Sequence, residues 1–230
     1  MLDHFKSAVE IIYPQSCGGC GSPGAILCRK CRDLFRRVET ASSCPYCGRW
    51  LSTPNVCGAC TESPPPFERG YYGFYFEGPL REALLAFKFK GRKEIGRLLI
   101  RLLEGELKVM REVFDVIAPL PVTEKRLKER GFNQTYVMAE EIAAITARPL
   151  SLSSLYKQKE TKDQYTLSRE ERRKNVRGAF AVRKAETIRG KRILLVDDLM
   201  TTGNTVREAS RILLSAKAKA VVVFALARTP

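Results

Sequence analysis

The sequence predicts an α/β protein in which helices flank a parallel sheet, with a small cysteine-rich module in front of it. Apolar runs typical of buried strands alternate with helical patterns over residues 67–230, as in a parallel sheet covered on both faces. All eight cysteines precede residue 61. Residues 64–66 are three prolines, which fit neither a helix interior nor a central strand. We therefore expect an N-terminal module over 1–62 and a main domain over 67–230.

The cysteines form four C-x-x-C pairs, a spacing typical of metal sites. They are Cys17 with Cys20, Cys28 with Cys31, Cys44 with Cys47, and Cys57 with Cys60. Two thiolates three positions apart grip one tetrahedral ion, and two such pairs complete its four ligands. We therefore predict two structural Zn²⁺ sites in a double zinc ribbon. Pairing in sequence order and a cross-braced pairing both satisfy the spacing, and neither leaves a ligand position open for catalysis.

The chain is strongly basic, with 40 Lys and Arg against 25 Asp and Glu and a net charge of +15 over 230 residues. This charge predicts anionic partners. Because the charge is spread over several clusters, it suits nucleic acid or an acidic partner, and equally a solvated basic surface. No apolar run approaches the roughly 20 residues that span a bilayer, and the first residues lack the apolar core of a signal peptide. We expect a cytoplasmic protein that does not insert into membranes.

Three elements are expected to open the main domain. Aromatic and β-forming residues at 71–76 predict a strand. Apolar residues at helical spacing predict helices over 80–87 and 95–103. Because a strand followed by helices is a typical unit of α/β domains, these segments support the predicted fold class.

Five further elements complete the expected sheet. An apolar segment at 116–121, closed by prolines, predicts a short strand, and 136–145 predicts a helix. A further strand is expected at 149–152. The helix at 204–216 offers apolar side chains to the sheet, and the uncharged run at 220–227 predicts a strand buried on both faces.

One junction in the main domain predicts chemistry. An apolar run at 193–196 ends in Asp197 and Asp198, and a turn of small residues at 201–205 then opens a helix. A strand that leads through such a turn into a helix makes an anion site, because free amides and the helix dipole converge there. The two acids would repel a phosphate but suit sugar hydroxyls or a Mg²⁺ carried by the ligand. The junction predicts a phosphorylated ribose; the alternative is an ordinary turn whose aspartates cap the helix.

Residues 196–205 resemble the signature with which type I phosphoribosyltransferases bind phosphoribosyl pyrophosphate (PRPP). The whole chain from about residue 17 resembles the ComF (ComFC-like) competence family within that superfamily. The segments that carry this resemblance, besides the cysteines, are 87–91, 119–121, 130–134 and 164–180. The resemblance implies the type I phosphoribosyltransferase fold with a hood or lid, PRPP and Mg²⁺ as ligands, and a role in natural transformation.

The resemblance also implies roles for individual residues. Asp197 and Asp198 would bind the ribose diol, directly or through Mg²⁺. The 5′-phosphate would lie on Thr201, Thr202, Gly203, Asn204 and Thr205. The loop after 119–121 would take the place of the pyrophosphate loop, with the candidate ligands Arg126, Lys128 and Arg130. The polar stretch 157–177 would close over PRPP as a lid; the alternative is an exposed loop and helix.

The resemblance leaves the acceptor of the phosphoribosyl group open. Purine phosphoribosyltransferases carry an acidic residue where this chain has Thr201, which argues against purine salvage. Two functions follow. The first is Mg²⁺-dependent transfer of phosphoribose to an unknown acceptor. The second is a non-catalytic PRPP sensor that binds single-stranded DNA or another competence protein.

Overall fold

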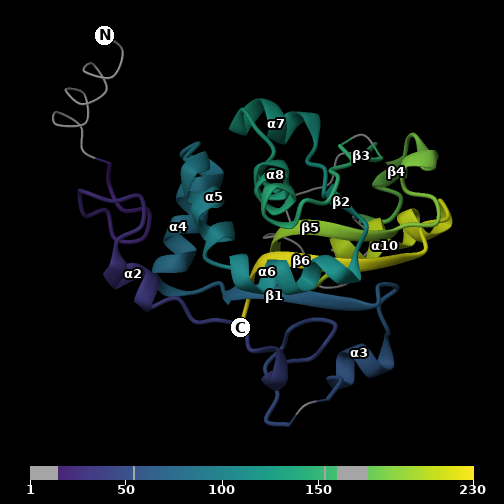
Figure 1. The fold of residues 1–230 in the computed structure, drawn as a ribbon, viewed down its shortest axis with the longest axis horizontal. Coiled ribbons are helices and arrows are strands. Elements are labelled where there is room, and N and C mark those ends of the chain that lie inside the picture. The colour runs from purple at the N-terminus through teal and green to yellow at the C-terminus, as the bar shows by residue number, and fades with distance from the viewer. Residues whose placement is uncertain (1–14, 54, 153, 160–175) are drawn as a thin grey trace.

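The computed structural model describes residues 15–53, 55–152, 154–159 and 176–230. Its centre is a four-stranded sheet in the order β1-β6-β5-β2, in which every neighbouring pair is parallel (Figure 1). The strands are β1 (Arg69–Tyr75), β2 (Val116–Pro119), β5 (Arg192–Met200) and β6 (Ala220–Arg228). The two central strands are apolar along most of their length, so they are buried on both faces. The predicted α/β class with a parallel sheet is confirmed.

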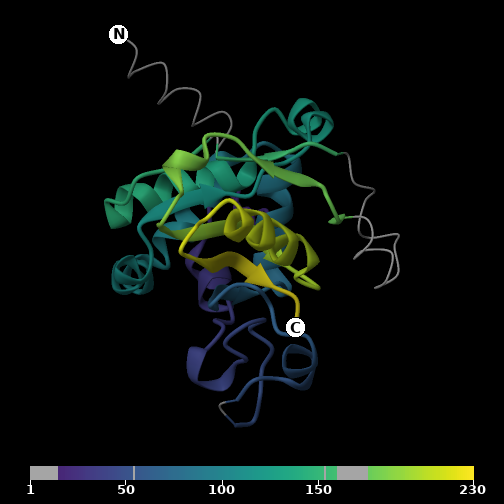
Figure 2. The ribbon, with the colours of Figure 1, turned by 90° about the vertical axis from the view of Figure 1, so that its right-hand side faces the viewer.

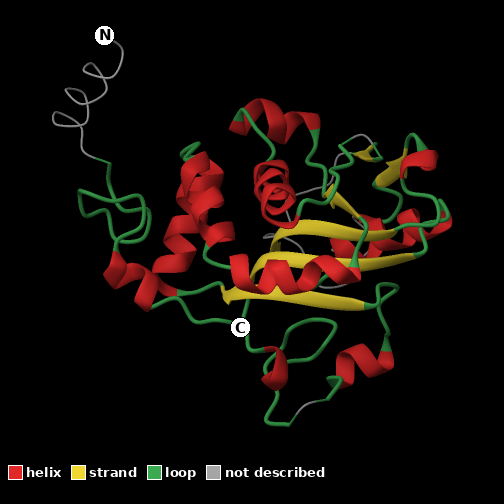
Figure 3. Ribbon diagram, in the orientation of Figure 1, coloured by secondary structure: helices red, strands yellow, loops and turns green. Residues whose placement is uncertain are grey.

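Helices cover both faces of this sheet. Alternate residues of β5 and β6 point to opposite sides, so Leu194 and Phe224 join one hydrophobic cluster while Leu195 and Val223 join another. The first cluster lies under α4 (Gly78–Phe89), α5 (Lys93–Arg101), α6 (Glu104–Met110) and α8 (Gln134–Thr146). The second lies under α10 (Asn204–Ser215), behind the sheet in Figure 3. Within the described residues, no helix is both long and apolar enough to cross a membrane.

Some expected elements differ from the structure. The strand predicted at 149–152 is wrong, since only Leu150 forms an isolated bridge with Ile117. Pro149 has no amide hydrogen to donate there, which limits the pairing. Four helices and strands of the main domain were not expected: α6, α7 (Glu124–Arg130), and the antiparallel pair β3 (Leu155–Lys157) and β4 (Phe180–Val182). The other predicted strands and helices of the main domain are present within a few residues of their expected bounds.

The first half of the cysteine module packs into the main hydrophobic cluster. It includes α2 (Arg29–Asp33) and lies beside α4 and α5 (Figure 1). Leu27 and Phe35 are buried in the same cluster as the α4 and α5 side chains. A Cβ at Gly18 would stand 2.5 Å from the side chain of Ile95, so glycine is needed for this close approach. The first half therefore shares its core with the main domain.

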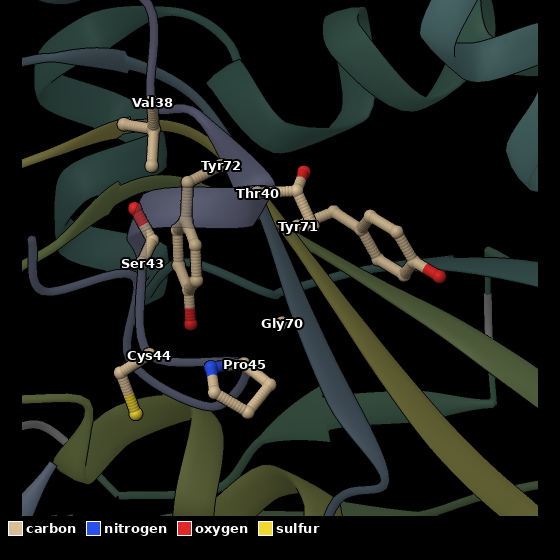
Figure 4. A pocket seen from close by; sticks show the side chains of 8 residues that line it. All are labelled: Val38, Thr40, Ser43, Cys44, Pro45, Gly70, Tyr71 and Tyr72. Carbon is tan, nitrogen blue, oxygen red and sulfur yellow. The ribbon is translucent and has the colours of Figure 1, made fainter. Parts of the chain in front are cut away.

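The second half lies below β1 (Figure 1), at the bottom of the molecule in Figure 2. It contains η1 (Thr40–Ser42) and α3 (Gly58–Glu62). Gly70 of β1 donates its amide to the carbonyl of Pro45 at 2.8 Å, and Arg228 donates its Nε to the carbonyl of Cys47 at 2.6 Å. Figure 4 shows the Tyr72 side chain of β1 directed between Ser43 and Pro45. Polar contacts and one aromatic ring thus hold this half to the sheet.

An ion pair between Asp115 and Arg192 joins the starts of β2 and β5. This pair should make the stability of the fold depend on pH. The Asp115 carboxylate accepts from the Arg192 backbone amide at 2.8 Å and from its guanidinium at 2.8 and 3.3 Å. These bonds lower the pKa of Asp115 to about 2. Because this pKa lies below the unfolded value of about 3.9, the pair stabilises the fold above pH 4, and the gain disappears between pH 4 and 2.

We expect Asp115→Asn to lower the free energy of unfolding by about 1 kcal/mol at pH 7, because both side chains are about one-third exposed and water screens the pair. Urea denaturation at pH 7 and pH 3 measures this difference, which should shrink at the lower pH. Equal stability of the variant and the wild type at pH 7 would refute it.

Candidate functional site

The junction of β5 and α10 is a tight turn at the carboxyl end of the sheet. β5 continues through the acid pair to Met200, so Asp197 and Asp198 lie in the strand and not after it. A turn at 201–203 then leads into α10, whose N-cap is Gly203 with a φ of +75°. Glycine adopts this conformation without strain. Gly203 offers no capping side chain to the amides of the first turn of α10.

The acid pair is desolvated and held in place by its neighbours. Asp197 accepts the Asp198 backbone amide at 2.8 Å. Desolvation, and then the charge of Asp198, raise the pKa of Asp197 to about 7. Asp198 pairs with Lys88 at 2.9 Å, and the two side chains are only 14% and 10% exposed. The ammonium group of Lys88 therefore neutralises part of the charge of the acid pair, and it comes from outside residues 193–205.

Lys88 is a site residue that sequence reasoning missed. It lies in the family segment 87–91, to which no role was assigned, and it is the last but one residue of α4. A lysine between Phe87 and Phe89 at the end of an apolar helix is the local signal for it. Its partner lies 110 positions away in the sequence, so only the fold brings the two charges together.

The buried pair predicts a large cost for removing its cation. We expect Lys88→Gln to lower the free energy of unfolding by about 3 kcal/mol in metal-free buffer, because Asp198 is left buried beside a second carboxyl group. The control is Lys108→Gln, which breaks an exposed pair with Glu104 and should cost less than about 0.5 kcal/mol. Urea denaturation compares the two. Equal costs would show that the Lys88–Asp198 pair does not form.

Residues 130–134 pack against the end of α4 that carries Lys88. Gly131 ends α7 (Glu124–Arg130) with a φ of +72°. Phe132 packs on Phe87 at a ring distance of 5.6 Å. Asn133 caps α8 by accepting the Thr135 amide, and it also donates to the carbonyl of Leu120. The segment therefore forms a glycine turn followed by a helix cap, and Asn133 ties it to Leu120, directly after β2.

The candidate pyrophosphate ligands lie on a helix and not on a loop, which corrects the expectation. Thr123 caps α7 by accepting the Arg126 amide at 3.3 Å, so residues after β2 turn directly into the helix. Arg130 lies over the ring of Phe89 at 4.9 Å, next to the end of α4 that carries Lys88. Lys128 is exposed on α7. The structure thus brings Arg130 near the end of α4 and leaves Lys128 on the outer surface.

The expected lid falls mostly outside the described residues, which omit 160–175. Its two flanks are joined by β3 and β4, in which Leu155 pairs with Val182. Glu208 of α10 is buried and accepts the amide of Gly178 at 2.8 Å. The second flank of this segment is therefore attached to α10, the helix that follows the turn at 201–203.

The eight cysteines form two tetrads in sequence order. They are Cys17, Cys20, Cys28 and Cys31, and Cys44, Cys47, Cys57 and Cys60, with the sulfurs of each within 4.8 Å of one another. Sulfurs bound at 2.3 Å to a tetrahedral Zn²⁺ stand about 3.8 Å apart. The sulfurs of Cys20 and Cys28 are 3.8 Å apart, and those of Cys47 and Cys57 are 3.6 Å apart. Both tetrads therefore fit zinc, and the cross-braced alternative is excluded.

Backbone amides prepare these sulfurs for a metal. Burial alone would raise the pKa of Cys17, but the amides of Cys28, Cys20 and Gly19 outweigh it and lower the pKa to about 6. The pKa of Cys44 falls to about 7 in the same way. Thiolates are the form that binds zinc, so each tetrad contains a ready ligand at neutral pH.

The second tetrad contacts α10, the helix that follows the turn at 201–203. Arg207, in the first turn of α10, has its guanidinium 4.0 Å from the sulfur of Cys60. Its backbone amide bonds to the carbonyl of Gly203 at 2.9 Å. One residue therefore links the cysteine module to the glycine at which α10 begins.

Comparison with known proteins finds both parts of this architecture. The family model for the phosphoribosyl transferase domain matches residues 133–230, and that for the double zinc ribbon domain matches residues 8–61. The DNA utilization protein YhgH of Salmonella typhimurium is 31% identical over 95% of this chain and 99% of its own length.

Two further relatives carry competence names. Competence protein F of Haemophilus influenzae is 31% identical over 86% of this chain and 90% of its own length. Competence protein ComFC of Bacillus subtilis is 30% identical over 90% of this chain and 86% of its own length. The chain therefore belongs to the ComF (ComFC-like) competence family, and in it a double zinc ribbon precedes a phosphoribosyl transferase domain.

Proposed function

We propose that this protein binds PRPP and acts in DNA uptake as a Mg²⁺-dependent phosphoribosyltransferase whose acceptor is unknown. The observation that carries the proposal is the junction of β5 and α10, where two carboxylates and the first turn of a helix meet. The relatives named for competence and DNA utilization support the biological setting.

Each part of this junction suits one part of PRPP. The amides and hydroxyls of residues 201–205 would hold the 5′-phosphate, because a helix N-terminus attracts anions. Asp197 and Asp198 would orient the ribose hydroxyls. When bound with the ligand, Mg²⁺ neutralises charge on the leaving pyrophosphate. Transfer through a transition state with positive charge on the sugar asks the protein mainly for positioning and electrostatics, which these residues supply.

Lys88 adds a charge switch to this proposal. In the ligand-free protein it neutralises Asp198 at 2.9 Å. For Asp198 to receive the ribose, the ammonium group has to leave it, and the pyrophosphate is the nearest anion that PRPP would offer. Lys88 would therefore keep the acid pair stable without ligand and bind the leaving group with it.

Calorimetry and a turnover assay test the proposal in two steps. PRPP with Mg²⁺ should bind with one site per chain, and PRPP without Mg²⁺ should bind more weakly. Release of pyrophosphate with a panel of nucleobases then tests transfer. If PRPP does not bind at all, both catalysis and PRPP sensing are excluded.

The second candidate is a non-catalytic accessory factor that senses PRPP and binds single-stranded DNA or a competence protein. It is favoured by Thr201, which stands where purine phosphoribosyltransferases have an acidic residue. The net charge of +15 exceeds what one ligand cleft requires. PRPP binding without pyrophosphate release for any acceptor would select this candidate.

A further inference from the structure

A pocket of about 230 Å³ lies between the two halves of the zinc ribbon, at the end of β1. Three segments form it, and its lining residues are Arg36, Arg37, Glu39, Trp50 and Tyr75. It therefore exists only where the ribbon is docked on the sheet.

Backbone pairing sets the walls of this pocket. Residues 36–38 run beside the end of β1, with the Tyr75 amide bonded to the carbonyl of Arg36 at 2.9 Å and the Val38 amide to that of Gly73 at 3.1 Å. Trp50 pairs with Ser43 in an antiparallel bridge of the second ribbon half. The side chains that line the pocket therefore belong to segments whose backbone is hydrogen-bonded to neighbouring segments.

The side chain of Trp50, which lines the pocket, is exposed to water, and packing within the fold does not explain this exposure. Trp50 is 62% exposed, and it is the only tryptophan of the chain. In the same lining, the Arg36 guanidinium lies 4.1 Å above the ring of Tyr75. The Tyr75 side chain is buried beneath it, and its hydroxyl has no hydrogen-bond partner among the described residues. An exposed indole and a guanidinium held on an aromatic ring in one pocket indicate a site for a flat ligand with polar edges.

The two arginines are positioned before any ligand arrives. Arg37 donates to the carbonyl of Leu102 at 2.6 Å and also pairs with Glu106. Arg36 pairs with Glu77 through its Nε at 2.9 Å. In the part of the chain that the structure describes, the terminal nitrogens of Arg36 donate no hydrogen bond. This leaves a planar pair of donors at the pocket for an anion such as a phosphate.

We propose that this pocket binds one nucleotide with an unpaired base, either free or within a single strand. The base would stack on Trp50, its polar edge would meet Glu39, and its phosphate would bind Arg36. Stacking on aromatic rings beside arginine is how proteins hold unpaired bases. A base inside a duplex is stacked on its neighbours and does not reach such a pocket.

This site is independent of the proposed PRPP site. Tyr75 pairs in register with Arg228 of β6, and Arg228 with Met200 of β5, so the pocket and the turn at 201–203 lie at the same end of the sheet, two strands apart. The variant Asp197→Asn/Asp198→Asn should therefore bind nucleotides in this pocket as well as the wild type does. If the protein does not bind PRPP, nucleotide binding in this pocket is still expected. If the pocket does not bind a nucleotide, PRPP binding is still expected.

The sole tryptophan makes the test direct. We would titrate the protein with dTMP, with a 12-nucleotide oligo(dT) and with a duplex of the same length, and follow tryptophan fluorescence. We expect the single strand to quench the Trp50 fluorescence saturably. This quenching should be stronger than the quenching by the duplex. Quenching by dTMP as well identifies a free nucleotide as a sufficient ligand, whereas quenching by the oligonucleotide alone identifies the strand as the source. No quenching by either ligand at millimolar concentration overturns the inference.

Variants decide whether the pocket carries the binding. With a fluorescently labelled oligonucleotide and anisotropy as the readout, Trp50→Ala and Arg36→Gln should each weaken binding about tenfold, while Trp50→Phe keeps a stacking ring and stays within about threefold of the wild type. Arg97→Gln removes an arginine of similar exposure on α5 and should have no effect beyond about twofold. If Trp50→Ala and Arg36→Gln bind as Arg97→Gln does, the inference is wrong.

Discussion

Asp197→Asn is expected to abolish useful PRPP binding and at the same time to stabilise the ligand-free protein. The carboxylate that would receive two ribose hydroxyls contributes about 1.5 kcal/mol for each charge-assisted bond, so affinity should fall roughly 100-fold. The same carboxylate is desolvated beside Asp198, which raises its pKa to about 7. Its ionisation therefore costs stability that an amide does not cost.

The sign of the stability effect depends on pH. Because the folded pKa of about 7 lies above the unfolded value of about 3.9, the wild type loses stability as the pH rises between these two values, and no further loss occurs above pH 7. Asp197 is half-buried, so water screens part of the penalty. We expect Asp197→Asn to gain about 1 to 2 kcal/mol at pH 8 and little at pH 4.

Urea denaturation in metal-free buffer at both pH values and PRPP calorimetry measure the two effects. Asp33→Asn is the matched control, because Asp33 is an exposed partner of Arg29 on α2, and it should change neither quantity appreciably. Undiminished PRPP affinity in Asp197→Asn would remove this carboxylate from the site. Lower stability at pH 8 would contradict the electrostatic explanation.

The two zinc tetrads are expected to differ in what their loss does to the protein. Cys17 and Cys31 are buried in the main hydrophobic cluster with α4 and α5, whereas Cys44, Cys57 and Cys60 form a small cluster of their own. A metal that holds the first tetrad therefore also holds part of the domain core. The second tetrad holds a ribbon that rests on the sheet through polar contacts.

We expect Cys31→Ser to bind one zinc per chain instead of two and to lower the midpoint of the main thermal transition by roughly 10 °C or more, which corresponds to about 3 kcal/mol. Cys60→Ser should also bind one zinc but leave the α/β transition within about 3 °C. Its ribbon should unfold separately, which the fluorescence of Trp50 reports. Metal analysis and calorimetry compare the variants. A single transition that falls equally in both would show that the tetrads are not independent.

The sequence predicts the sheet and the turn at 201–203 between β5 and α10 well, because both depend on local patterns. An uncharged run such as 220–227 is compatible with a central strand, and Gly203 before a helix is a local signal for a turn. The four C-x-x-C pairs likewise predict two metal sites without knowledge of the fold. In each case, residues close in the sequence determine the structure.

Other features depend on contacts between distant segments. The Lys88–Asp198 pair joins α4 to β5, and no pattern around Lys88 identifies its partner. The resemblance implied a loop after residues 119–121, yet the Thr123 cap and Gly131 define a helix over residues 124–130. The spacing of the cysteines also does not choose between pairing schemes, which the docking of each ribbon half against a different surface decides.

A crystal structure with PRPP and Mg²⁺ bound tests the central claim most directly. The account predicts the 5′-phosphate on the amides of residues 201–205, the ribose hydroxyls on Asp197 and Asp198, and the Lys88 ammonium moved from Asp198 towards the pyrophosphate. Density for the ligand elsewhere, or an unchanged Lys88–Asp198 pair with no ligand at the turn under saturating PRPP, would contradict it.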